Sequence, residues 1–330
     1  MRLYDRSRDG SFHRRLADKL KTMGIEEEIK QKAVSLGFDL AGITSADDID
    51  LRQIEQFKEW LKKGCNAEMA FLERDVEKRF SPVSILPEAK SVICVGINYK
   101  VISKPDKDTL QIASLSLYPD YHIFIREKLL LIADFLMNKD ENMKFKICVD
   151  SSPIAEKALA MRVGLGFIGK NRLLTNSKFG SFLLLGEIIT DMQLKPDKPL
   201  NEQACGNCRK CIEACPTKAL SDDGFDARKC VSYLTVKKGE IDAELKEKMG
   251  THLFGCEECL RACPYNENSP ICEKQQIGFV PRQIKLKPEE IISWTEKDFE
   301  KFAENSTMLW FGLQRMKRNA LICQEHQERQ

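Results

Sequence analysis

Long apolar runs are missing from this sequence of 330 residues. The longest, around Leu129 to Ile132, falls far short of the roughly 20 residues that a membrane-spanning helix needs. An apolar leader is also missing, because the twin Arg14-Arg15 is followed by the polar stretch ADKLK instead of a hydrophobic segment. We therefore expect a cytoplasmic protein without a membrane partner, built as one large domain or two ordinary ones.

A strong net charge and internal repetition are absent as well. The 52 Lys and Arg residues nearly balance the 50 Asp and Glu residues, so the net charge of +2 argues neither for nor against a nucleic-acid partner. No repeat of solenoid length and no low-complexity tract is visible. The sequence also contains no Walker loop, HExxH or GxSxG motif. Enzymes that depend on one of these motifs are therefore not indicated.

Cysteine, by contrast, is abundant, with 13 residues. Eight of the 13 are concentrated between residues 205 and 263. A secreted disulfide scaffold is usually short and spreads its cysteines along the chain, so this distribution predicts reduced thiols that hold metal. The other five are expected to be buried thiols: Cys65, Cys94, Cys148, Cys272 and Cys323.

The spacing of the concentrated cysteines is that of a bacterial ferredoxin. The first run, CGNCRKCIEACP, has the C-x2-C-x2-C-x3-C-P pattern, and the second, CEECLRACP, is one cysteine short of it, which Cys230 can supply. A pair of zinc sites is the alternative, but zinc ribbons use two CxxC pairs separated by a longer loop. The spacing therefore favours two [4Fe-4S] clusters.

The ferredoxin pattern also predicts which cysteines share a cluster, since the last cysteine of each run ligates the other cluster. The first cluster is expected to take Cys205, Cys208, Cys211 and Cys263. The second is expected to take Cys215, Cys230, Cys256 and Cys259.

Helix-like and strand-like segments alternate before the cysteines. Helices are expected at residues 26–36, 51–63 and 121–137, and strands at 39–43, 91–98, 145–149 and 182–190. This alternation predicts an α/β layered domain at residues 25–198, preceded by a basic extension at 1–24. The cysteine-rich domain is expected at 199–270 and a helical tail at 271–330. The tail's apolar face is expected to be formed by Trp294, Phe299, Phe302, Trp310, Phe311 and Leu313.

Asp150 is the carboxylate most suggestive of chemistry. It follows the strand at 145–149 and precedes Ser152-Pro153, a favourable helix start, at an edge where α/β sheets often bind ligands. Partial desolvation would raise the pKa of Asp150 and make it a proton donor, while helix capping is the alternative. Two roles are likewise compatible with His122: a group of the active site, or a histidine satisfied at the end of a helix.

A G-x-G-x-x-G sequence occurs at Gly164, Gly166 and Gly169. A dinucleotide fingerprint must follow a strand and open a helix, whereas these glycines follow the helix expected at 153–163. We therefore reject NAD and FAD. The glycines either close that helix or allow a different cofactor to approach the backbone.

An ordered set of segments resembles the epoxyqueuosine reductase family, and it covers roughly residues 25–320. In the first domain these segments are IKQKAVSLGFDLAGIT, EKRFSPVSILPEAKSVICVGINY, DYH, VDSSPIAEKALAMRVGLGFIGKN and FGSFLLLGEIIT. In the rest of the chain they are CGNCRKCIEACPTKAL, ARKCVSYLT, GCEECLRACPYN and MKRNAL. One departure is ASLSLYP before DYH, where the substrate-side wall is expected to differ.

The resemblance implies an α/β (α+β) domain that binds base-off cobalamin, then a ferredoxin-like two-cluster domain and a short helical tail. The clusters would pass electrons from a low-potential donor to cobalt. Reduced cobalt would open the epoxide of epoxyqueuosine at the wobble position of tRNA, and loss of water would give queuosine. The chain is expected to act as a monomer.

The resemblance also assigns roles to single residues. Asp150 occupies the position of the family's proton donor. Arg79, Lys170, Leu185 and Ser232 occupy positions that contact cobalamin. The alternatives are surface charge for Arg79 and Lys170, packing for Leu185 and a turn hydroxyl for Ser232.

Two other functions are compatible with the clusters alone. A corrinoid enzyme of the reductive dehalogenase type would keep the cofactors and change the substrate. A non-enzymatic electron-transfer protein would have the clusters and bind no cobalamin.

Overall fold

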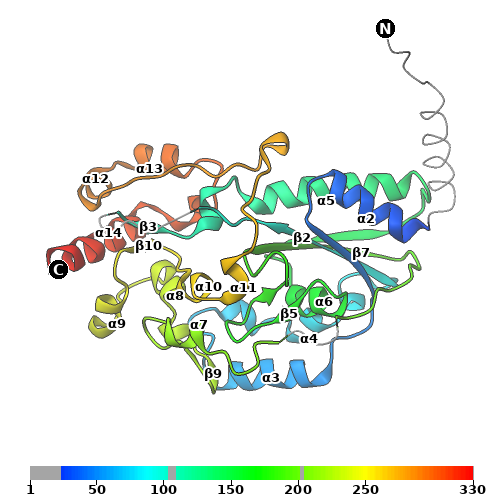
Figure 1. Cartoon of the computed structure of the whole chain (residues 1–330), viewed down its shortest axis with the longest axis horizontal. Helices are drawn as coiled ribbons and strands as arrows, with labels where there is room; N and C mark the ends of the chain where they lie inside the picture. The colour runs from blue at the N-terminus through cyan, green and yellow to red at the C-terminus, as the bar shows by residue number, and fades with distance from the viewer. Residues whose placement is uncertain (1–23, 103–108, 201–203, 330) are drawn as a thin grey trace, which may run out of the picture.

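The computed structural model describes residues 24–102, 109–200 and 204–329 (Figure 1). Residues 1–23 of the expected N-terminal extension lie outside the described part. Among the described residues, no helix is long and apolar enough to cross a membrane.

A four-stranded sheet forms the centre of the first domain. Its strands lie in the order β1 (Leu40–Ser45), β2 (Ser91–Asn98), β7 (Leu183–Thr190) and β4 (Phe145–Cys148). Every neighbouring pair of this sheet is antiparallel, whereas the general rule that places ligands at the end of α/β strands was made for parallel sheets. Strand β2 is buried along its whole length, which explains its nearly continuous apolar sequence.

Helices cover both faces of this sheet (Figure 1). On one face, α2 (Ile25–Ser35) and α5 (Tyr121–Met137) pack against Ile93, Val95 and Ile97 of β2. On the other, α6 (Glu156–Arg162) and the short α4 (Val76–Phe80) pack against Val92 and Cys94. Alternate residues of β2 thus belong to two different cores, because successive side chains of a strand point to opposite faces of the sheet.

The local sequence predicts the long elements well and the start of α6 poorly. The expected ranges 91–98 and 121–137 coincide with β2 and α5. The helix expected from Ser152-Pro153 is wrong, because α6 begins at Glu156. Tight turns replace its first turn: Ser151 N–H donates to the Val149 carbonyl, and Ile154 N–H donates to the Ser152 carbonyl.

Short elements connect these layers. Helix α3 (Leu51–Lys62) is capped by Asp50, whose side chain accepts from the Arg52 amide. The remaining elements of the first domain are η1 (Ala70–Leu72), η2 (Pro82–Ser84), β3 (Gln111–Ile112), η3 (Ser114–Leu117), β5 (Phe167–Ile168) and β6 (Leu174–Thr175).

The cysteine-rich segment consists of short helices and turns. Its elements are α7 (Lys210–Glu213), β8 (Leu220–Ser221), β9 (Gly224–Phe225), η4 (Ala227–Lys229), α8 (Val231–Val236), α9 (Ala243–Lys248), β10 (His252–Phe254), α10 (Glu258–Arg261), α11 (Pro264–Glu267) and η5 (Gln275–Ile277). Strand β10 pairs in parallel with β3. The Lys100 ammonium donates to the carbonyls of Asn266 and Ser269. Strand pairing and these side-chain bonds therefore join the segment to the sheet domain.

The tail is helical, as expected, with α12 (Pro288–Ser293), α13 (Glu296–Ala303), η6 (Leu309–Phe311) and α14 (Leu313–Glu328). Phe299, Phe311 and Leu313 are buried. The prediction that Trp310 is buried is wrong, since it is 60% exposed and lies beneath the Arg315 guanidinium, 5.2 Å away. Trp294 and Phe302 are half-buried against the same core.

The five scattered cysteines are free thiols. Cys94, Cys148, Cys272 and Cys323 are buried, as expected, whereas Cys65 is only half-buried. Cys65 lies just after α3, where its carbonyl accepts from the Ala227 amide. This position next to the cysteine-rich segment, instead of in a core, explains its exposure.

Candidate active site

The eight concentrated cysteines lie close to one another. Cys211 has Cys205, Cys208 and Cys263 around it, and Cys259 has Cys256, Cys230, Cys211 and Cys215 nearby. Burial raises the pKa of Cys211 and raises that of Cys230 to about 11. The division into the two sets that the crossing pattern predicts, and the ligation itself, stay predictions. Among the described side chains, no group of three His, Cys, Asp or Glu is arranged to hold a single metal ion.

Backbone amides point at the sulfurs of both sets. The Lys170 amide donates to Cys205 Sγ at 3.3 Å. The Ser232 and Tyr233 amides, at the start of α8, lower the pKa of Cys230 against the effect of burial, and the Tyr265 amide acts in the same direction on Cys263. N–H···S bonds of this kind stabilise the negative charge of iron–sulfur clusters, so the residues present fit two clusters.

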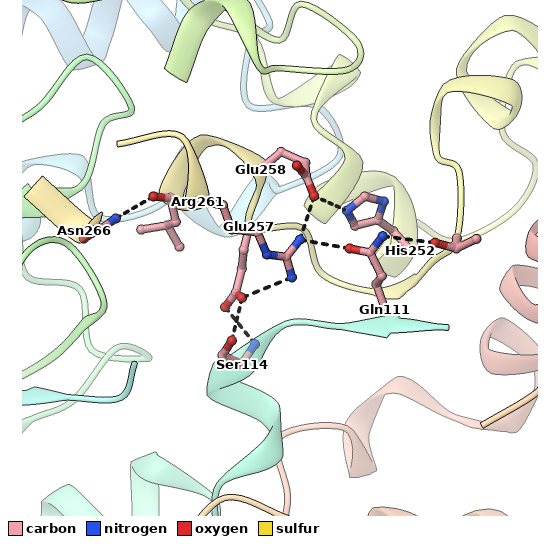
Figure 2. A network of polar contacts seen from close by, with 9 residues as sticks. Gln111, Ser114, His252, Glu257, Glu258, Arg261 and Asn266 are labelled. Atoms are coloured by element: carbon pink, nitrogen blue, oxygen red, sulfur yellow. Dashed lines mark hydrogen bonds and ion pairs between the residues drawn. The ribbon is translucent and has the colours of Figure 1, made fainter. Parts of the chain in front are cut away.

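The second expected set comprises Cys215, Cys230, Cys256 and Cys259. Glu257 and Glu258, which lie between Cys256 and Cys259 in the sequence, belong to a network of polar side chains (Figure 2). Glu257 is buried and accepts from the Ser114 amide at 2.7 Å and the Ser114 hydroxyl at 2.6 Å. Arg261 donates to Glu258 at 2.6 Å and to the Gln111 side chain at 2.9 Å. The network therefore joins the cysteine-rich segment to β3 and η3 of the sheet domain.

His252 belongs to this network, and the sequence offered no local reason to select it. Its ring is buried, and its Nε2 lies 3.4 Å from Glu258 Oε1. Burial alone would lower the pKa of His252, but hydrogen bonding to the Cys256 thiol and the Glu258 carboxylate raises it to about 10. Three residues separate His252 from Cys256 in the sequence, and the turn between β10 and α10 lies between them.

Asp150 lies at the end of a chain of polar groups on the sheet domain. Its Oδ2 is 3.1 Å from His122 Nε2, and His122 Nδ1 is 2.8 Å from Asp120 Oδ1. Asp150 has a left-handed backbone with φ of 48°, and its side chain is 58% exposed. Such a conformation is costly for a residue other than glycine and is frequent at functional sites.

The expected upward shift of the Asp150 pKa is wrong. The hydrogen bond from His122 lowers the pKa of Asp150 and outweighs desolvation. Bonds to Asp120 and Asp150 raise the pKa of His122 to about 9. At neutral pH the pair is therefore an imidazolium beside a carboxylate. Asp150 does not cap α6, whose N-cap is Ala155. His122 lies in the first turn of α5 and its side chain also contacts Asp150.

Glu156 contacts Asp150, Glu187 interacts with Glu156, and local sequence patterns revealed neither carboxyl. Glu156 accepts from the Asp150 amide at 2.6 Å. Glu187 is fully buried and lies opposite Cys94 on β2 and Cys148 on β4. Burial raises the pKa of both, that of Glu156 to about 7. The Glu156 bond holds the strained Asp150 backbone in place.

The four residues expected to contact cobalamin lie on two structural units. Leu185 is buried on the α6 face of the sheet, and Phe80, the neighbour of Arg79, belongs to the same core. The Arg79 carbonyl accepts from Ala155, and its buried Nε has no hydrogen-bond partner in the described structure. The Lys170 ammonium donates to the carbonyls of Gly206 and Cys208. Ser232 lies at the start of α8.

The three glycines of the G-x-G-x-x-G sequence pack against the protein's own chain. A Cβ at Gly164 would meet the Lys198 carbonyl at 2.6 Å, and one at Gly166 would meet the Thr175 carbonyl at 2.4 Å. A Cβ at Gly169 would meet the Asn171 side chain at 2.8 Å. The glycines therefore serve close packing of the loop after α6.

Comparisons with known proteins decide the family. The description "4Fe-4S double cluster binding domain" matches residues 204–266, and "Epoxyqueuosine reductase QueG, DUF1730" matches residues 79–151. The epoxyqueuosine reductase of Francisella cf. novicida is 34% identical over 314 residues, covering 90% of this chain and 86% of the relative. The chain belongs to the epoxyqueuosine reductase family.

Solved structures of this family have the same fold. The enzyme from Streptococcus thermophilus superposes with a TM-score of 0.81 at 31% identity, covering 92% of this chain and 82% of that one. An epoxyqueuosine reductase solved with an epoxyqueuosine-modified tRNA-Tyr stem loop gives a TM-score of 0.84 at 31% identity, covering 92% and 81%. The family and its double-cluster domain confirm the resemblance that the ordered motifs indicated.

Proposed function

We propose that this protein reduces epoxyqueuosine to queuosine in tRNA, with Asp150 delivering a proton. The observation that carries the proposal is the alignment of Asp150, His122 and Asp120 in a chain that also holds a double-cluster domain. A family member was solved with the modified tRNA stem loop, which supports tRNA as the substrate here.

The reaction consumes two electrons and two protons, because the epoxide oxygen leaves as water and a carbon–carbon double bond remains. Iron–sulfur clusters pass electrons singly, so two of them suit a two-electron reduction. The protein must also provide protons at the site of oxygen release, and His122 and Asp150 are placed to do so.

His122 is the proton store in this proposal. Its Nδ1–H donates to Asp120, which fixes the ring, and its Nε2–H donates to Asp150. Because Asp150 is a carboxylate at neutral pH, the proton moves from His122 through Asp150 to the leaving oxygen, and His122 is left as a neutral imidazole. The lowered pKa of Asp150 and the raised pKa of His122 have the same cause, because the two side chains share one proton.

We propose base-off cobalamin as the third cofactor. The fit rests on the unpartnered buried Arg79 Nε and on the position of Lys170, which bridges the sheet domain and the first cysteine loop. Arg79, Lys170, Leu185 and Ser232 would hold it. When bound, it would supply a cobalt centre that the clusters can reduce. Titration of the protein with cobalamin, followed by its visible spectrum, tests this binding.

We also propose where electrons enter. An open surface hollow of about 520 Å³ is lined by Cys263 together with Lys210 and Arg261, so a low-potential donor can approach the first cysteine set from solvent there. The monomeric state, the cytoplasmic location and the domain boundaries stay predictions.

The activity is expected to fall at high pH. Because His122 carries the proton below its pKa of about 9, kcat/KM should be constant from neutral pH to about 9 and then decline. In His122→Gln the Asp150 carboxyl is the remaining proton source. The decline of kcat/KM should therefore move to acid pH, near the ordinary carboxyl pKa of about 4. pH–rate profiles of the two proteins measure this shift. An unchanged profile in the variant would exclude His122 as the store.

A further inference from the structure

Asp150 is held by helices from both faces of the sheet. It follows β4, which is an edge strand. Its carboxylate contacts His122 in the first turn of α5, which covers one face. Its amide donates at 2.6 Å to Oε1 of Glu156, the first residue of α6, which covers the other face (Figure 1). The position of the Asp150 side chain therefore depends on one contact from each layer of helices.

The other backbone hydrogen bonds of the loop after β4 are local. The loop lies between the buried residues Val149 and Ile154. The Ser151 and Ile154 amides each donate to the carbonyl two residues earlier, so these bonds shape the turns without tying the loop to a helix. In the described part of the chain, the acceptor of the Asp150 amide is Glu156. This side chain therefore joins the loop backbone to α6.

The left-handed backbone of Asp150 makes the Glu156 bond important for the direction of the side chain. A φ of 48° persists in a residue other than glycine only where the surroundings fix it. The bond to Glu156 fixes the peptide plane before Asp150, and the contact with His122 fixes the carboxylate. Without the first of these bonds, φ can return to its usual negative range, which turns the Cα–Cβ bond and carries the carboxylate away from His122.

We propose that Glu156 is a positioning residue for proton transfer, because its side-chain oxygen holds the Asp150 amide and so keeps the Asp150 carboxylate against His122. The inference rests on the proposed function, in which His122 passes a proton through Asp150. The length of the side chain and its acceptor oxygen are what the geometry requires of residue 156, and its charge is not.

The test compares two variants that separate the length of Glu156 from its charge. Glu156→Gln keeps the length and an acceptor oxygen, so kcat for queuosine formation should stay near the wild-type value. Glu156→Asp keeps the carboxylate but is one methylene too short to reach the Asp150 amide. Its kcat should fall by about 10²-fold, the cost of misplacing a reacting group by about 1 Å, while KM for the tRNA stays unchanged.

A second readout requires no turnover. The pKa of His122 is measured by NMR titration of the full chain, labelled with ¹³C-histidine and reconstituted with oxidised clusters; the His122 signal is the one that His122→Gln removes. The ring faces the carboxylates of Asp120 and Asp150 and stacks on Tyr121. Its pKa of about 9 should persist in Glu156→Gln and fall in Glu156→Asp, where the Asp150 carboxylate has moved away.

Glu296→Ala is the matched control, because Glu296 is likewise the first residue of its helix, α13, and is exposed; kcat and the His122 pKa should keep their wild-type values. The inference is overturned if Glu156→Gln loses as much as Glu156→Asp or more, and equally if neither variant changes. A wild-type protein that forms no queuosine would overturn the proposed function. The His122 pKa of the two variants would then still decide whether Glu156 positions Asp150.

Discussion

Asp150→Ala is expected to slow queuosine formation by about 10²–10⁴-fold, the range for loss of a positioned proton donor. The side chain is more than half exposed and forms no part of a core, so the fold and the cofactor content should persist. The pKa of His122 should fall, because one of the two carboxylates that raise it is gone.

Two comparisons separate proton donation from damage. Asp140→Ala removes an exposed carboxylate after α5 and should leave the rate unchanged. Asp150→Asn keeps the shape and a hydrogen-bonding group but cannot give up a carboxyl proton, so it should be nearly as slow as the alanine variant. The measurement is product formed per minute, with iron and cobalamin determined on the same samples. Wild-type turnover by Asp150→Asn would remove Asp150 from the mechanism.

Cys263→Ala is expected to remove the first cluster and with it the turnover. Cys263 follows Cys256 and Cys259 in the sequence, yet the structure places it with Cys205 and Cys208. Iron should fall from about eight to about four atoms per chain, the difference of one [4Fe-4S] cluster.

The decisive form of this test combines variants. In Cys205→Ala/Cys208→Ala, the first cluster is already lost, so adding Cys263→Ala should leave about four iron atoms in place. Adding Cys215→Ala instead should remove them. Cys323→Ala changes a buried thiol of α14 and should keep all the iron. Loss of the remaining iron on adding Cys263→Ala would show that ligation follows sequence order.

Local sequence predicted the parts of the fold that depend on local patterns. The branched run of β2 and the long apolar period of α5 determined their own boundaries. Cysteine spacing predicts a double-cluster domain, which the matching family description confirms, while the division of the eight cysteines into two sets of four stays a prediction.

What the sequence did not reveal depends on contacts between distant segments. The burial of Glu187 follows from a register that pairs it with both Cys94 and Cys148, which no local pattern encodes. The start of α6 shifted because the turns at residues 151–154 outweighed the Ser-Pro signal. The pKa of Asp150 moved opposite to expectation because His122, 28 residues earlier, bonds to it.

The central claim is tested most directly by the nucleosides of treated tRNA. The protein is reconstituted anaerobically with iron, sulfide and cobalamin, then mixed with a low-potential reductant and tRNA that carries epoxyqueuosine. After digestion, mass spectrometry should show queuosine replacing epoxyqueuosine, and omission of either cofactor should prevent the change. Unchanged epoxyqueuosine in the presence of both loaded cofactors would contradict the proposed substrate.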